Sequence, residues 1–127
     1  MKNLLVSILC LGLLIVPWLI YDSYSTKTLN HCTYTLEKEV IPAIKANEWK
    51  SAEESYMKIE EDWSTFEAVS EYFLDTQSVN EADELINKTK YHIIMYDNSN
   101  AAACSAELIH QLNYLHENEM LSFGNVF

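Results

Sequence analysis

The segment NEWKSAEESYMKIEEDWSTFEAVSEYF, residues 47–73, places apolar or small side chains at alternating steps of three and four. These positions are Trp49, Ala52, Tyr56, Ile59, Trp63, Phe66, Ser70 and Phe73. Charged residues, mostly glutamates, fill many of the positions between them. The spacing predicts a helix with a narrow apolar seam and a charged back, as in coiled coils and helical hairpins. Because Trp49 and Trp63 lie two heptads apart on one face, we expect both to be core anchors.

The same spacing occurs in three other segments. Between residues 24 and 46 it comprises Leu29, Cys32 or Thr33, Leu36, Val40 and Ala43 or Ile44. Between residues 78 and 96 it comprises Val79, Ala82, Ile86, Thr89, Ile93 and Tyr96. Between residues 101 and 121 it comprises Ala101, Cys104, Leu108, Leu112 and Leu115. No strand-like alternation competes with these stripes, so the sequence favours helices throughout.

Local signals suggest where some of these helices begin and end. Pro42 should kink the end of the first helix, because it cannot donate a hydrogen bond to the carbonyl of Lys38. Asn47 is a suitable N-cap for the second helix. Ser78, followed three residues later by Glu81, is a capping-box signature for the third helix.

Short turns between the predicted helices, such as the polar run at 97–100, make consecutive helices antiparallel neighbours. We therefore predict an all-α protein, with one N-terminal transmembrane helix followed by a small antiparallel helical bundle. In this organisation residues 1–25 are a membrane anchor with its juxtamembrane segment. Residues 26–127 form the extracytoplasmic bundle.

The chain ends on an apolar tail. Gly124 is expected to stop the last helix and, with Asn125, to turn the chain back. Phe123, Val126 and Phe127 would then cover the open end of the bundle, each contributing about 1.5–3 kcal/mol if buried. A disordered tail and a tail that docks on a membrane partner are the alternatives.

The N-terminal run LLVSILCLGLLIVPWLIY, from Leu4 to Tyr21, contains no charge. Its eighteen residues form a helix of about 27 Å, close to the hydrocarbon thickness of about 30 Å. Lys2 precedes the run and Asp22 follows it, so the positive-inside rule places the N-terminus in the cytoplasm. We therefore expect a single-pass protein of the cell membrane with the bulk of the chain extracytoplasmic.

A cleaved signal peptide is the alternative interpretation of this run. Ser23-Tyr24-Ser25, beyond Pro17, has the small-x-small pattern that signal peptidases accept. The apolar run is longer than the usual 7–15 residues, however, and only one lysine precedes it, which favours a retained anchor. In either case the rest of the chain leaves the cytoplasm.

Charge and cysteine usage narrow the classes of function. The formal net charge of −11 disfavours binding to nucleic acid, whose phosphates it would repel. The cysteines Cys10, Cys32 and Cys104 include no C-x-x-C pair, which argues against zinc-ribbon and thioredoxin-type sites. Cys32 and Cys104 could pair across two helices in an oxidising compartment, or fill the core as free thiols.

Few residues suggest chemistry. His116 and Glu119, three residues apart, resemble one half of a metal site in a helical bundle, but the sequence offers no second half. A nucleophile elbow, a Gly-rich phosphate loop and a Cys–His constellation are all missing from the sequence. We therefore predict that the protein is not an enzyme. We expect no catalytic residues, no cofactor or metal ligands and no small-molecule substrate.

The segment DNSNAAACSAELIHQLNYLHENEMLSFGNVF, residues 97–127, resembles the C-terminal pattern of the bacterial domain of unknown function 4363 family. The features that carry the resemblance are helix tryptophans, one of them in an Asn-Glu-Trp-Lys stretch, a late His with a Glu three residues on, and an Asn-aliphatic-Phe terminus. In this chain they are Trp49, Trp63, His116, Glu119 and Asn125-Val126-Phe127.

Members of that family are short chains with one N-terminal membrane helix and a helical remainder. They often carry a Phe-x-Asp-His run, where this chain has Phe73-Leu74-Asp75-Thr76, so a role for that His does not transfer. The family has no established activity. Its genes often lie beside that of a small multi-spanning membrane protein, so the resemblance implies such a partner.

Two functions of different classes remain open. The first is a structural or interaction subunit that supports a multi-spanning membrane protein. The alternative is an extracytoplasmic module that binds or senses a ligand or cation through its acidic faces or its interior. The candidate core and tail residues are Trp49, Trp63, Phe66, Phe73, His116, Glu119, Asn125 and Phe127.

Overall fold

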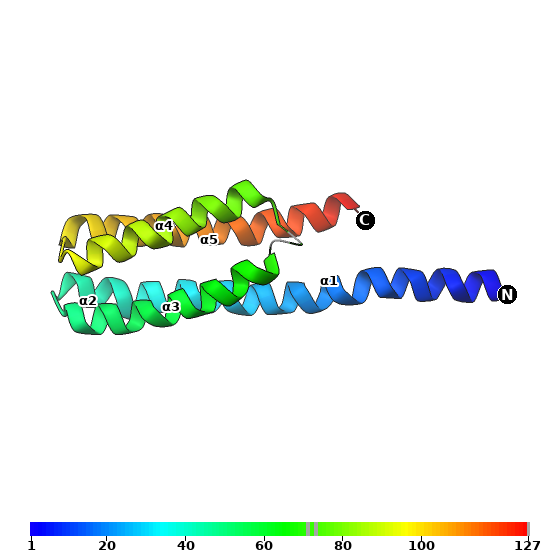
Figure 1. Ribbon diagram of the computed structural model, residues 1–127, viewed down its shortest axis with the longest axis horizontal. Coiled ribbons are helices and arrows are strands. Elements are labelled where there is room, and N and C mark those ends of the chain that lie inside the picture. Colours follow the sequence, from blue (N-terminus) through cyan, green and yellow to red (C-terminus); the bar gives the residue numbers. More distant parts are fainter. Residues whose placement is uncertain (71, 73, 127) are drawn as a thin grey trace.

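The computed structural model describes the backbone of residues 1–70, 72 and 74–126, and the side chains of residues 1–70, 72 and 74–117. Within these residues every regular element is a helix and no strand is present, as predicted (Figure 1). The elements are α1 (Lys2–Thr35), the π-helix η1 (Leu36–Val40), α2 (Ile41–Lys45), α3 (Trp49–Ser70), α4 (Thr76–Ile94) and α5 (Asn98–Val126).

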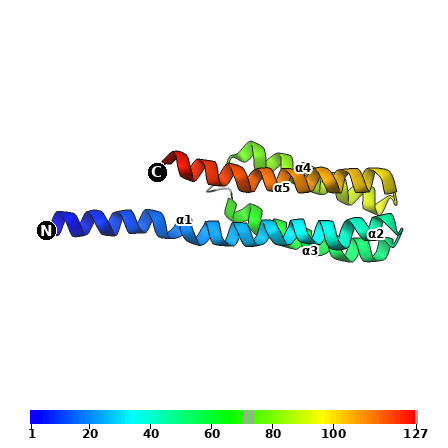
Figure 2. The same ribbon diagram turned by 180° about the vertical axis from the view of Figure 1, so that it is seen from behind.

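The helices lie lengthwise beside one another and reverse direction at each turn (Figures 1 and 2). The α2–α3 and α4–α5 turns lie together at one end, which we call the tip. The α3–α4 connection lies at the other end, where the end of α5 extends somewhat beyond it and the N-terminal part of α1 projects farthest. The buried apolar side chains of all helices form one cluster. Its fully buried large members include Leu29, Leu36, Val40, Ile44, Tyr56, Ile59, Phe66, Ile93, Leu108, Leu112 and Leu115.

Helix α1 is continuous from the apolar N-terminal run into the core. Residues 2–20 are exposed or half-buried in the isolated chain, whereas Tyr21, Ser25, Leu29 and Cys32 are buried. By length and composition, this is a helix that could cross a membrane. The apolar run and the first core helix are therefore one element with no linker between them.

Pro42 is accommodated by a change of helix type. The preceding residues form η1, and the N–H of Ile41 donates to the carbonyl of Leu36, five residues back. Pro42 lies in the first turn of α2, where a missing N–H is tolerated. The disturbance expected from Pro42 thus takes the form of a wider turn, after which the helix continues to Lys45.

The prediction that Asn47 is the N-cap of the second helix is wrong. Asn47 has a φ of 57° and ends α2 instead. Its N–H donates to the carbonyl of Ile44, and the N–H of Glu48 donates to that of Ala43. This is a Schellman motif, in which Asn takes the left-handed position usually held by Gly. The last carbonyls of α2 have no intrahelical partner, and the left-handed conformation of Asn47 lets the N–H groups of Asn47 and Glu48 donate to two of them.

The second turn at the tip has the same form, and the polar run 97–100 is not the turn. Tyr96, with a φ of 56°, takes the left-handed position and is exposed rather than part of the buried stripe. Asp97 precedes α5 and caps it, because its carboxylate accepts from the N–H of Asn100 and its carbonyl from the N–H of Ala101. Hydrogen bonds from the side chain and backbone of Asn100 lower the pKa of Asp97.

The prediction of a capping box at Ser78 and Glu81 is wrong, because α4 begins one turn earlier and its N-cap makes no side-chain cap hydrogen bond. The N-cap of α4 is Asp75, and Ser78 lies inside the helix with its Oγ donating to Asp75 Oδ2 at 3.3 Å. Because Asp75 has extended backbone, the helix begins at Thr76, three residues before the apolar stripe. The Glu81 carboxylate accepts from Gln77 Nε2 instead of from a backbone N–H.

The predicted stop at Gly124 is also wrong, because α5 continues through Gly124 and Asn125 to Val126. One glycine inside a helix costs about 1 kcal/mol relative to alanine, which a long helix tolerates. The predicted packing of Phe123, Val126 and Phe127 over the bundle end concerns side chains outside the described residues.

The proposed disulfide between Cys32 and Cys104 is not formed. Both cysteines are free and buried, and Cys10 is free and exposed on the apolar part of α1. Cys32 belongs to the core cluster, where it behaves as a small apolar side chain.

Asn98 joins the two turns at the tip. Its Nδ2 donates to the carbonyl of Ile44 at 2.6 Å and to Asn47 Oδ1 at 2.9 Å. Beside it the rings of Trp49 and Tyr96 stack with their centroids 5.2 Å apart. We call these four side chains, Asn47, Trp49, Tyr96 and Asn98, the tip junction.

The tip junction leads to a stability prediction. Asn98→Ala should lower the free energy of unfolding by about 1–3 kcal/mol, because a part-buried carbonyl loses its donor. Asn113→Ala, an exposed asparagine on the same helix, is the control and should lie within about 0.5 kcal/mol of wild type. Urea unfolding of the full chain in mild detergent, followed by circular dichroism, measures both. Equal midpoints for the two variants would contradict a joining role for Asn98.

Candidate functional site

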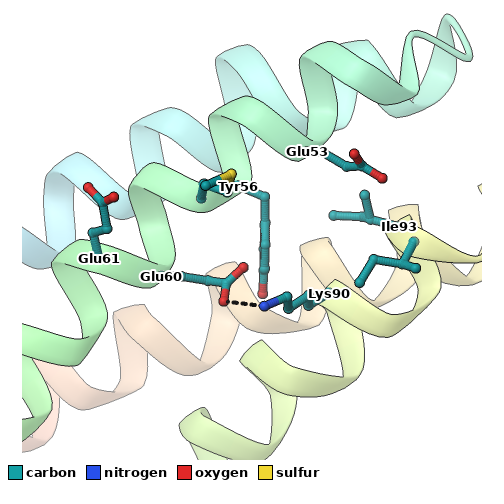
Figure 3. A pocket seen from close by; sticks show the side chains of 8 residues that line it. Glu53, Tyr56, Glu60, Glu61, Lys90 and Ile93 are labelled. Carbon is teal, nitrogen blue, oxygen red and sulfur yellow. Dashed lines mark hydrogen bonds and ion pairs between the residues drawn. The ribbon is translucent and has the colours of Figure 1, made fainter.

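A groove of about 340 Å³ lies between α3 and α4 (Figure 3). Five of its residues come from α3 and three from α4. They are Glu53, Tyr56, Met57, Glu60 and Glu61, with Lys90, Ile93 and Ile94. On each helix these positions are one, three or four residues apart, so they form a strip along one face. We call this feature the α3–α4 groove.

The floor of the groove is apolar and rigid. Tyr56 and Ile93 are each about 1% exposed. The side chain of Tyr56 reaches from α3 toward α4, and its hydroxyl donates to the carbonyl of Ile86 at 2.6 Å (Figure 3). This buried hydrogen bond fixes the separation of the two helices along the groove.

Burial raises the pKa of Tyr56 far above its ordinary value of 10.0. A hydrogen bond with Thr89 lowers it in part, whereas the nearby Glu60, Cys104 and Cys32 raise it further. Burial and the charge of Asp62 likewise raise the pKa of Cys32 to about 12. At neutral pH these groups are protonated, so the interior under the groove holds a structural tyrosine and an inert thiol.

The rim of the groove is acidic. Lys90 Nζ lies 2.9 Å from Glu60 Oε2, and both side chains are partly exposed (Figure 3). Exposed pairs of this kind contribute about 0–1 kcal/mol, so the pair orders the rim more than it stabilises the fold. Glu53 and Glu61 add two carboxylates without a second lysine, so the eight lining residues carry a formal charge of −2.

Exposed apolar side chains extend from the rim toward the tip. Met57 and Ile94, which face each other across the groove, are 58% and 52% exposed. Tyr91, in the last turn of α4, and Met95 and Tyr96, directly after the helix, are exposed to a similar degree. We call these five residues the α4 apolar patch. A cluster of exposed large apolar side chains on a small acidic domain is typical of a protein-interaction surface.

The residues singled out from the sequence lie elsewhere. Trp63 is buried against Phe66, with ring centroids 5.3 Å apart, and its Nε1–H donates to Asp83 Oδ1 at 3.2 Å. Phe66 is fully buried, and Trp49 is half-buried in the tip junction. Phe73 lies outside the described residues. The tryptophans and Phe66 therefore contribute to packing and lie outside the groove.

The His116–Glu119 pair is described only in part. His116 is half-buried, and its Nδ1 has no hydrogen-bond partner within the described side chains. The side chains of Glu119, Asn125 and Phe127 lie outside the described part. Among residues whose side chains are described, no group of three or more His, Cys, Asp and Glu could hold a metal ion.

Sequence reasoning missed the α3–α4 groove, because six of its eight lining residues flank the buried stripes, which supply only Tyr56 and Ile93. The available signal was the run of large apolar residues Tyr91, Ile94, Met95 and Tyr96. All but Tyr96 fall outside the predicted stripe of this helix. An acidic rim around an apolar floor is complementary to a segment that is basic and amphipathic.

Comparison with known proteins gives one match. The sequence model of a family described as domain of unknown function (DUF4363) matches residues 21–126. No curated protein and no solved structure matches the chain. The matched region begins at Tyr21, the first buried residue of α1, where the packed part of the structure also begins.

Tyr56→Phe should reduce the sensitivity of folding to high pH. Because the pKa of Tyr56 is raised in the folded chain, the unfolded chain loses this proton first as the pH rises. The stability linked to this group is therefore present below about pH 10 and is lost above it. Between about pH 9 and pH 11 the wild type should lose more unfolding free energy than Tyr56→Phe.

The measurement is urea unfolding of the full chain in detergent at several pH values. Removing the hydroxyl should also cost about 0.5–1.5 kcal/mol at neutral pH. Tyr34→Phe, in which an exposed tyrosine loses its hydroxyl, is the matched control and should follow wild type at every pH. Parallel pH profiles for wild type and Tyr56→Phe would show that Tyr56 is not the titrating group.

Proposed function

The chain belongs to DUF4363, a family of domains of unknown function, and we propose that it is a structural or interaction subunit of a multi-spanning membrane protein. In this proposal the N-terminus is cytoplasmic and residues 4–21 cross the membrane once. The remaining helices form an antiparallel bundle outside the cytoplasm.

The observation that carries the proposal is the continuity of α1. Its first part exposes an uninterrupted series of large apolar side chains, and its second part supplies the core residues Leu29, Cys32 and, through η1, Leu36. Exposing so many apolar groups to water would be costly, whereas a bilayer solvates them. A domain that shares its first helix with the anchor is held at a fixed height and orientation above the membrane.

The α3–α4 groove and the α4 apolar patch provide a surface for the partner. Burying Met57 and Ile94 in an interface would contribute about 1.5–3 kcal/mol each before the cost of association. The acidic rim favours a partner segment that carries Lys or Arg beside apolar residues. We propose that such a segment is an extracytoplasmic loop or helix of the multi-spanning protein.

Topology is tested by labelling Ser51→Cys, an exposed site early in α3. We expect a membrane-impermeant thiol reagent to label this variant in intact cells. Cys32 and Cys104 are buried, so the unmodified chain supplies the background. Labelling that requires cell lysis would reverse the proposed orientation.

Partner binding is tested by crosslinking and mass spectrometry on native membranes. Wild-type chain should recover one multi-spanning protein in stoichiometric amount. The double variant Met57→Lys with Ile94→Lys should reduce this recovery about tenfold or more, because a loss of about 1.4 kcal/mol is tenfold in affinity. Tyr34→Lys alters an exposed site outside the groove and should leave recovery unchanged. Full recovery with the double variant would remove the groove from the interface.

A further inference from the structure

We propose that a second groove, at the end of the domain from which the apolar part of α1 projects, holds an acyl chain of a phospholipid from the outer leaflet. This inference rests on the proposed membrane span and adds that the domain is seated in the bilayer surface. The groove has a volume of about 520 Å³. Its residues are Pro17, Ile20, Tyr21 and Tyr24 of α1 with Thr65 and Val69 of α3.

The groove is chemically suited to a hydrocarbon chain. None of its six lining residues is charged. The polar side-chain groups are the hydroxyls of Thr65 and of the two tyrosines. Val69 is 37% exposed at the groove, and Tyr72, just beyond α3, is almost fully exposed. Water is a poor solvent for such a surface, whereas an acyl chain suits it, because the hydroxyls of Tyr21 and Thr65 are already hydrogen-bonded within the protein.

The length of α1 sets the depth of the groove. Its unburied N-terminal part, residues 2–20, spans about 28 Å, slightly less than a hydrocarbon core of about 30 Å. The helix therefore has no spare length with which to lift the domain away from the membrane. Pro17 and Ile20 lie within the hydrocarbon by this measure, so Thr65 and Val69 on the opposite wall lie at its boundary.

A buried contact holds α3 at this depth. The hydroxyls of Tyr21 and Ser70 are hydrogen-bonded at 3.0 Å, and the rings of Tyr21 and Phe66 stack at 6.5 Å. Trp18 packs on Tyr21 with ring centroids 6.1 Å apart, so aromatic residues gather where a bilayer's interfacial belt would lie. Because the two helices are joined here, the α3 wall cannot rise out of the membrane without unpacking Tyr21.

Helix α5 returns to the same end of the domain, beside the projecting part of α1 (Figures 1 and 2). Its sequence from residue 120 to the C-terminus contains no charged side chain. The backbone of α5 thus brings an uncharged stretch of sequence to this end of the domain.

The test uses the purified full chain in phosphatidylcholine vesicles that contain a lipid with a diazirine in its acyl chain. After irradiation, peptide mass spectrometry locates the lipid adducts. We expect adducts on residues 4–20 of α1 and also on Thr65 or Val69 of α3. Met57 lies on the same α3 and is more exposed than Val69, but it should carry none.

Matched variants test whether the groove itself is responsible. Val69→Lys should abolish the α3 adducts and leave those on α1, whereas Met57→Lys should leave both. Thr65→Lys provides a second disruption of the same wall at an exposed site, and circular dichroism shows whether each variant keeps its helices.

The outcomes separate the two proposals. Adducts on α1 with none on α3 overturn the lipid groove and leave the membrane span standing. Absence of adducts from α1 as well overturns both. A photoreactive residue at position 69 in native membranes supports the proposal if it captures lipid, and a discrete protein adduct there overturns it in favour of a partner helix.

Discussion

Helix α1 carries an exposed apolar run and a core-forming face on one continuous backbone, and the other helices are arranged around that constraint. From Tyr21 onward its buried face supplies a wall of the core, while the residues before it expose apolar side chains on every side. A continuous helix of this kind couples the position of the apolar run to that of the domain, although Pro17 has no N–H and so removes one backbone hydrogen bond near their junction. The π-helical turn η1 lies well inside the packed region, where α3 and α5 support it.

The two ends of the domain are held together by different chemistry. At the tip, Asn98 joins the turns through hydrogen bonds to Ile44 and Asn47. At the opposite end, the Tyr21–Ser70 hydrogen bond and the adjoining aromatic rings join α1 to α3. Asn98 therefore fixes the two hairpins to each other at the tip, whereas the Tyr21 contacts close the hairpin of α1 and α3 at its open end. Such a rigid body suits a part that positions or braces a membrane protein better than one that must close around a ligand.

The surface is divided in a way that follows from this arrangement. The α3–α4 groove is acidic at its rim and apolar at its floor, which favours a basic amphipathic segment of a partner. The second groove, between α1 and α3, is lined by uncharged residues and lies beside the apolar run, which favours lipid. If both proposals hold, the anchor, the lipid contact and the partner contact act along one rigid axis. A force or displacement of the partner would then reach the membrane through α1.

Apolar periodicity was sufficient to place the core. The stripe residues Leu29, Ile59, Ile86 and Leu108 are buried because a helix with one apolar face can hide it only against other helices. The uncharged apolar run from Leu4 to Tyr21, by contrast, indicated a helix long enough to span a membrane. Local motifs were less informative about boundaries, because Asn47, Ser78 and Gly124 are each compatible with more than one role. Which role each takes depends on which neighbouring backbone groups remain to be satisfied.

Only the tertiary structure could decide the surfaces. Met57 and Ile94 line the α3–α4 groove together, and Pro17 and Val69 line the second groove, between α1 and α3. In each case the two residues come from helices whose pairing no single stripe specifies. An apolar stripe on a helix indicates which side chains are buried, but it does not indicate which other helix packs against them. That choice was made by turn geometry at the tip and by the hydrogen bonds of Tyr21, Tyr56 and Asn98, whose partners are distant in sequence.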